Sequence, residues 1–136
     1  MKRRTFRRLR AHSGSTAKIL PVGRDSVEPS SHHHNVYVVL LKSGVARLRA
    51  VRLANPRRDP KKPCVYVGLT GLSPDERFEN HLQGIKSSSF VRRYAVRLLP
   101  ELYSHLNPMP YEAAVRMELD LAEDLRRLGY TVSGGH

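Results

Sequence analysis

The stretch CVYVGLTG, residues 64–71, alternates two kinds of side chain and sets the fold that we expect. Successive side chains of a β-strand point to opposite faces of the sheet. One face of this strand would be apolar, with Val65, Val67 and Leu69. The other face would carry Tyr66, Gly68 and Thr70. The run therefore predicts a strand whose second face holds a phenol beside a position without a side chain.

A helix is predicted directly after this strand. Ser73 fits the N-cap, Pro74 the first helical position and Glu76 the returning bond of a capping box. An apolar stripe at helical spacing indicates the face turned to the core, and it consists of Phe78, Leu82 and Ile85. Arg77 and His81 are four residues apart, so they are neighbours beside that stripe.

Strands are also predicted on both sides of this segment. The β-branched run NVYVVLL at residues 35–41 indicates a buried strand that pairs antiparallel with residues 64–71. The run FVRRYAVRLL at residues 90–99 is interpreted as a third strand. Two minor elements are expected, a short helix around residues 45–51 and a short closing strand within residues 130–135.

The longest predicted helix covers residues 111–128 and ends at Gly129, and Glu118 interrupts its apolar stripe. That stripe consists of Tyr111, Ala114, Val115, Leu121, Ala122, Leu125 and Leu128. Three further acids lie off the stripe, namely Asp120, Glu123 and Asp124. Because an unpaired buried carboxylate is costly, Glu118 must meet a cation. A structural ion pair with Arg77 and a bound metal ion both satisfy this requirement.

Composition bounds the class of protein. The chain has 136 residues, which suits one domain, and its single cysteine fits a reducing compartment. No apolar run approaches the roughly 20 residues of a membrane helix, and no signal peptide is evident, so we expect a cytoplasmic protein. We expect residues 1–31 to be a basic flexible tail and residues 32–136 to form the folded domain.

Net charge gives the first functional indication. The chain carries a formal charge of +12, and residues 1–31 contribute eight Lys/Arg against two acids, so the folded part is also basic. A basic domain with a basic arm is typical of nucleic-acid binding, although charge also serves simple solubility.

The motifs NVYVVLL, CVYVGLTG, ERFENHL and AAVRMEL, taken in this order, resemble the GIY-YIG endonuclease domain. The resemblance covers roughly residues 35–130. It implies an α/β fold of the α+β type, with a small three-stranded, mostly antiparallel sheet flanked by helices. The two tripeptides of the family appear here as Asn35-Val36-Tyr37 and Tyr66-Val67-Gly68.

The resemblance also implies a set of catalytic residues. The family's helix arginine matches Arg77, the following Tyr or His position matches His81, and the metal-binding glutamate matches Glu118. Thr70 occupies a position that is often polar in relatives. The chain departs from the family pattern in three places. Asn35 replaces the first glycine, the C-terminal run YTVSGGH lacks the frequent asparagine, and the spacing from Tyr66 to Arg77 is about one residue longer than usual.

By resemblance, the reaction is metal-dependent hydrolysis of a phosphodiester bond, with one Mg²⁺ or Mn²⁺ held by Glu118 and waters. Tyr66 would act as the general base or relay, and Tyr37 would position the water or Tyr66. Arg77 would bind the scissile phosphate, and His81 would orient the reacting groups or act as the base. Gly68 would let the sugar-phosphate backbone come close.

Nucleic acid, more often DNA than RNA, is the expected partner, and a protein partner could supply specificity. The candidate binding residues are Arg57, Arg58, Lys61, Lys62, Lys86, Arg92 and Arg93. The alternative to an endonuclease is a nucleic-acid-binding module that keeps the GIY-YIG fold and does not cut. A third interpretation is a basic ribosome-like accessory protein in which the motifs are coincidental.

Overall fold

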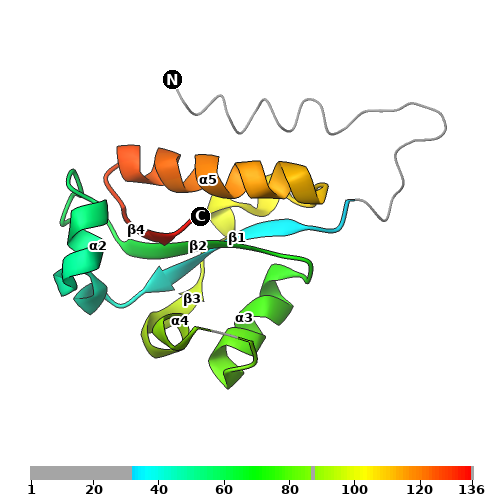
Figure 1. Cartoon of the computed structure of the whole chain (residues 1–136), viewed down its shortest axis with the longest axis horizontal. Helices are drawn as coiled ribbons and strands as arrows, with labels where there is room; N and C mark the ends of the chain where they lie inside the picture. Colours follow the sequence, from blue (N-terminus) through cyan, green and yellow to red (C-terminus); the bar gives the residue numbers. More distant parts are fainter. Residues whose placement is uncertain (1–31, 87, 136) are drawn as a thin grey trace.

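The computed structural model describes residues 32–86 and 88–135, which form a mixed four-stranded sheet between helices (Figure 1). The expected N-terminal tail lies outside the described residues. The strands are β1 (Asn35–Leu41), β2 (Cys64–Thr70), β3 (Ala95–Leu98) and β4 (Thr131–Gly134), in the spatial order β3-β1-β2-β4. The α-helices are α2 (Arg49–Ala54), α3 (Pro74–Gln83), α4 (Ser89–Tyr94) and α5 (Tyr111–Arg127).

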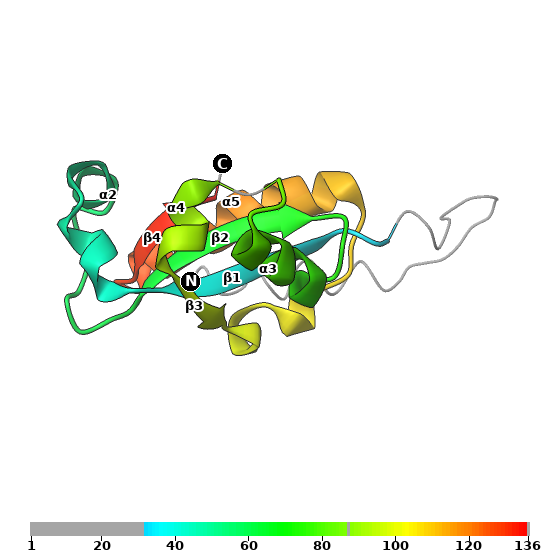
Figure 2. The same cartoon turned by 90° about the horizontal axis from the view of Figure 1, so that it is seen from below.

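The helices form two layers about the sheet. α5 lies along one face, whereas α3 and α4 lie against the other, with α2 at one end of the sheet (Figures 1 and 2). Short 3₁₀ turns at Ser43–Arg47, Pro100–Leu102 and Ser104–Leu106 join these elements. None of the helices in the described ranges is long and apolar enough to cross a membrane.

The central pair of strands confirms the predicted antiparallel pairing. Tyr37 lies opposite Gly68, and Val39 lies opposite Tyr66. Both tyrosines therefore share one face of the sheet, and the intervening valines share the other. Because Tyr37 contacts α3, the phenol face is the one that α3 and α4 cover, and the valine face packs toward α5.

The sheet differs from the three antiparallel strands that we expected. β4 adds a fourth strand, parallel to β2, and its Thr131 lies beside Cys64. α5 explains this pairing, since it carries the chain along the sheet and returns it at the end where β2 begins (Figure 1). The closing strand was predicted as a short run, but its direction depends on this crossover.

The third predicted strand is wrong over its first half. Residues 90–94 belong to α4, and only Ala95–Leu98 form a strand, which pairs antiparallel with the end of β1. Ser88 explains the helix because its side chain accepts a hydrogen bond from the backbone N–H of Val91, 3.2 Å away.

Two asparagine side chains complete the hydrogen bonding of the sheet. The Asn55 amide oxygen accepts from Val132 N–H at 2.9 Å, and its amide nitrogen donates to Val132 C=O at 3.0 Å. Asn107 pairs in the same way with the N–H and C=O of Val36, at 2.9 and 2.8 Å. Each side chain thus replaces a neighbouring strand at one position.

Candidate active site

Three aromatic side chains from three elements meet on the phenol face. The hydroxyl oxygen of Tyr37 lies 2.9 Å from Nε2 of His81, within hydrogen-bond distance. The ring centroid of Tyr66 lies 6.3 Å from that of Tyr37 and 6.1 Å from that of His81. β1, β2 and α3 therefore bring together three residues that the resemblance had assigned to one site.

The position of α3 is fixed at its start. Ser73 and Glu76 form the predicted capping box, with both bonds at 3.1 Å, and Pro74 occupies the first turn. The helix ends at Gly84, whose φ of 77° is favourable for glycine.

The face that α3 turns to the sheet differs from the predicted stripe. His81 is buried, with 1% of its surface exposed, whereas Leu82 and Ile85 are 45% and 47% exposed. Phe78 packs partly against the core as expected. The prediction for Leu82 and Ile85 was wrong because the partner of this helix face is the Tyr37 hydroxyl rather than an apolar surface.

Each phenol lies against a glycine of a neighbouring strand. A Cβ atom on Gly68 would lie 2.6 Å from the Tyr37 hydroxyl oxygen. A Cβ atom on Gly134 of β4 would lie 2.8 Å from a ring carbon of Tyr66. The space above Gly68 is therefore filled by Tyr37, which corrects our expectation that this glycine leaves room for a sugar-phosphate backbone. Gly134 was not predicted, and the Gly-Gly pair in YTVSGGH was its only signal.

Thr70 and Asn35 shape the turn between β2 and α3. The hydroxyl of buried Thr70 accepts a hydrogen bond from Leu72 N–H at 3.0 Å. The Asn35 amide donates to Leu72 C=O at 2.9 Å. These bonds hold the connection that leads into the capping box, so both residues act on the position of α3.

Glu118 enters the site from α5. Its side chain is buried, with 8% of the residue exposed, as the interrupted stripe predicted. Its charge raises the pKa of both Tyr66 and Tyr37, which places the carboxylate in the electrostatic neighbourhood of both phenols. Glu118 thus acts on the phenols from α5, in the helical layer opposite α3.

The buried face of α5 is otherwise shifted from the predicted stripe. Met117 and Asp124 are buried, whereas Tyr111 and Leu128 are about half exposed. Asp124 accepts a hydrogen bond from Arg127 at 3.0 Å, and this partner on the next turn explains how an acid is accommodated there.

Burial sets the protonation state of the cluster. Desolvation is the main cause that raises the pKa of Tyr37 and that of Tyr66. It also lowers the pKa of His81 to about 4, helped by the nearby charge of Arg77. At neutral pH the cluster therefore contains two neutral phenols and a neutral imidazole.

Arg77 lies at the open side of the cluster. Its Nη2 donates to the carbonyl oxygen of Lys86 at 2.9 Å, and its positive charge partly offsets the rise in the pKa of Tyr37 that burial causes.

Exposure divides the cluster into an outer and an inner part. Tyr37 and His81 are each 1% exposed, so a substrate cannot contact them in this structure. Tyr66 and Arg77 are partly exposed. Tyr37 and His81 therefore lie behind Tyr66 and Arg77 as seen from the solvent.

The cluster fits a sparsely coordinated divalent cation. Among residues 32–86 and 88–135 there is no group of three His, Cys, Asp or Glu side chains that could hold a metal ion. Mg²⁺ commonly binds one or two carboxylates and takes its other ligands from water and substrate phosphates. The single buried carboxylate of Glu118, whose charge acts on both phenols, matches that pattern.

The basic candidates fall into two groups. Arg57, Arg58, Lys61 and Lys62 lie in the connection between α2 and β2, and Lys62 lies 5.4 Å above the ring of Tyr130. The others, Lys86, Arg92 and Arg93, lie after α3 and on α4, on the phenol side of the sheet.

Comparison of the chain with protein-family models, curated proteins and solved structures finds no match.

Proposed function

We propose that this protein is a metal-dependent endonuclease that hydrolyses phosphodiester bonds in nucleic acid, with DNA as the first candidate, through a GIY-YIG-type site. The observation that supports this most is the convergence of Tyr66, Tyr37, His81, Arg77 and Glu118, which come from four elements. A net charge of +12 agrees with a polyanionic substrate.

The outer residues would contact the substrate. Arg77 would bind oxygens of the scissile phosphate, because its planar guanidinium matches two phosphate oxygens. Tyr66 would hold the attacking water through its hydroxyl. A divalent cation held by Glu118 would stabilise charge on the phosphate and lower the pKa of bound water.

The inner residues would hold the outer ones. The hydrogen bond between Tyr37 and His81 ties β1 to α3, so it fixes the distance between the Tyr66 strand and the Arg77 helix.

A nicking assay tests the proposal. Supercoiled plasmid and branched DNA are incubated with the protein and Mg²⁺ or Mn²⁺, with EDTA as a blank. Glu118→Gln is expected to lower the cleavage rate by at least about 100-fold, as removal of a group that organises transition-state charge does. Glu112→Gln is the matched control, since Glu112 is an exposed acid on the first turn of the same helix.

Two outcomes oppose the proposal. Equal cleavage by Glu118→Gln and the parent protein would exclude this site as the source of the activity. Tight binding without metal-dependent cleavage by the parent protein would instead support the non-cleaving binding module.

A further inference from the structure

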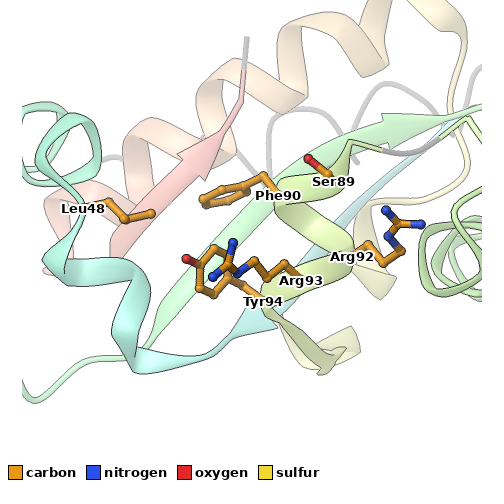
Figure 3. Close-up of a pocket in the computed structure, with 6 residues that line it drawn as sticks. All are labelled: Leu48, Ser89, Phe90, Arg92, Arg93 and Tyr94. Atoms are coloured by element: carbon orange, nitrogen blue, oxygen red, sulfur yellow. The ribbon is translucent and has the colours of Figure 1, made fainter.

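A groove beside α4 combines aromatic surface with positive charge. Its volume is about 400 Å³, and its lining residues are Leu48, Ser89, Phe90, Arg92, Arg93 and Tyr94 (Figure 3). We call this surface the α4 groove. It lies within the usual size range of ligand pockets, about 300–1,000 Å³.

The aromatic side chains of the α4 groove form one continuous surface. The ring centroids of Phe90 and Tyr94 lie 5.2 Å apart at an angle of 55°. Both rings are only partly buried, and Leu48 adds apolar surface with 37% of the residue exposed. Figure 3 shows Phe90 pointing across the groove toward Leu48. Such a surface offers π-faces that a planar ligand can use.

The charge of the α4 groove is positive. The Arg93 guanidinium lies 5.6 Å from the centroid of the Tyr94 ring. Within the described part of the chain, no salt bridge joins Arg92 or Arg93 to a carboxylate. Between Asn80 and Pro100 the sequence contains four Lys/Arg residues and no acid. A ligand of this groove is therefore expected to be anionic.

The α4 groove is connected to the candidate active site by a run of basic residues. Arg77, at the edge of the cluster, bonds the carbonyl of Lys86 in the connection that leads to α4. Arg92 extends from the other side of α4, away from Tyr94, and its guanidinium packs against the end of α3 at Gly84 (Figure 3). Arg92 is therefore the basic side chain of α4 that lies nearer to α3, the helix that carries Arg77.

We propose that the α4 groove binds an unpaired segment of a nucleic-acid substrate, with a base stacked on the Phe90 and Tyr94 surface and phosphates paired with Arg92 and Arg93. Aromatic faces reach a base only where it is unpaired, whereas cations alone bind duplex and single strand alike. The combination selects a substrate with a single-stranded segment, such as a flap or an open junction. This proposal specifies the substrate of the proposed endonuclease. It rests on that proposed function only for the claim that the bound strand is the one that is cleaved.

Binding in EDTA separates this proposal from cleavage. Fluorescence anisotropy is measured for the full chain with three labelled ligands of about 12 nucleotides, namely oligothymidine, an abasic strand and a duplex. Tyr94→Leu keeps an apolar side chain but removes the π-face, and we expect it to weaken oligothymidine binding by about tenfold. Abasic and duplex binding should change by less than about twofold, because their contacts are ionic.

Further variants separate stacking from charge. Tyr94→Phe is expected to keep oligothymidine binding, whereas Arg93→Gln should weaken binding to all three ligands and reduce the salt slope by about 0.7 for the single strand. Arg116→Gln removes the same charge from an exposed position of α5, in the opposite helical layer, and should leave oligothymidine binding unchanged.

Measurements on the unaltered chain avoid any question of folding. A 2-aminopurine placed within the oligothymidine should lose fluorescence on binding if it stacks on Tyr94 or Phe90. Absence of quenching, or equal losses of affinity for all three ligands in Tyr94→Leu, would overturn the proposal. Displacement of the strand by an acidic peptide at equal charge concentration would point to a protein partner instead. Loss of cleavage with an intact single-strand preference would defeat only the proposed endonuclease.

Discussion

At the scale of single residues, the ring of Tyr37 is the reason that position 68 requires a glycine. The structure gives Gly68 no positive φ, so the backbone itself tolerates a side chain. The restriction comes from Tyr37, which lies directly opposite on β1 and covers the Gly68 backbone. Because Tyr37 is held from behind by His81, its ring has little room to yield.

Gly68→Ala is expected to destabilise the protein by about 1–3 kcal/mol, the usual cost of overpacking a core. A urea unfolding curve measures the change. Gly44→Ala is the matched control, because the nearest atom to its Cβ would be a flexible Arg47 nitrogen 3.8 Å away. Equal stabilities for the two variants would show that the Tyr37 ring moves aside without cost.

The lowered pKa of His81 predicts that the protein loses stability in mild acid. Its pKa in the folded protein is lowered to about 4, below the unfolded value of about 6.5. The unfolded chain therefore binds an extra proton between these values, and the stability contributed by the neutral imidazole is lost as pH falls from about 6.5 toward 4.

His81→Gln tests this directly, since glutamine can keep a hydrogen bond to the Tyr37 hydroxyl but does not titrate. The free energy of unfolding is compared across this pH window, and the variant should show the shallower decline. Parallel curves would mean that other groups cause the acid sensitivity.

At the scale of elements, the asparagine side chains hold the sheet where strands are absent. Asn55 makes three hydrogen bonds while 4% exposed, and two of them satisfy both backbone groups of Val132 in β4. Since β4 also supplies the glycine beneath Tyr66, Asn55 supports the candidate site from a distance.

Asn55→Ala is expected to cost about 2–4 kcal/mol, because each buried backbone group left without a partner costs about 1–3 kcal/mol. Hydrogen exchange of the Val132 amide should accelerate. Asn35→Ala removes a single exposed hydrogen bond and serves as the control. Similar losses in both variants would contradict the strand-like role of Asn55.

The elements also show what the sequence could predict. β1, β2, α3 and α5 were predicted because alternation, the capping box and helical spacing are local signals. The parallel pairing of β4 was not predictable, since it depends on where α5 returns the chain. The core-facing side of α3 was predicted wrongly because Leu82 and Ile85 have the helical spacing of a buried apolar stripe. In the structure both are exposed, and His81 is the buried residue of this helix. The resemblance led us to expect Tyr37, Tyr66 and His81 in one place, and the structure brings these three side chains together, whereas the packing around them depends on contacts that are distant in sequence.

At the scale of the whole molecule, positive charge is shared between the described domain and residues 1–31, which carry eight of the 24 Lys/Arg residues. Contacts of Lys and Arg with phosphates add affinity that depends little on the base sequence. We therefore expect residues 1–31 to contribute to binding affinity and the described domain to contribute the proposed chemistry.

Deletion of residues 1–31 is expected to weaken nucleic-acid binding at moderate salt by about tenfold or more and to reduce the salt slope. The cleavage rate on saturating substrate should persist, with circular dichroism as the control for folding. Loss of metal-dependent turnover at saturation would show that these residues take part in the chemistry.

The contact between Tyr66 and Gly134 has a consequence for the order of assembly. The cluster draws on positions from 37 to 134, and the last of these is the surface on which the Tyr66 ring rests. The strands β1 and β2 can pair without β4, but the Tyr66 ring then lacks this support. The cluster is thus complete only when β4 has paired with β2, so a fragment that ends before residue 131 lacks the surface beneath the Tyr66 ring.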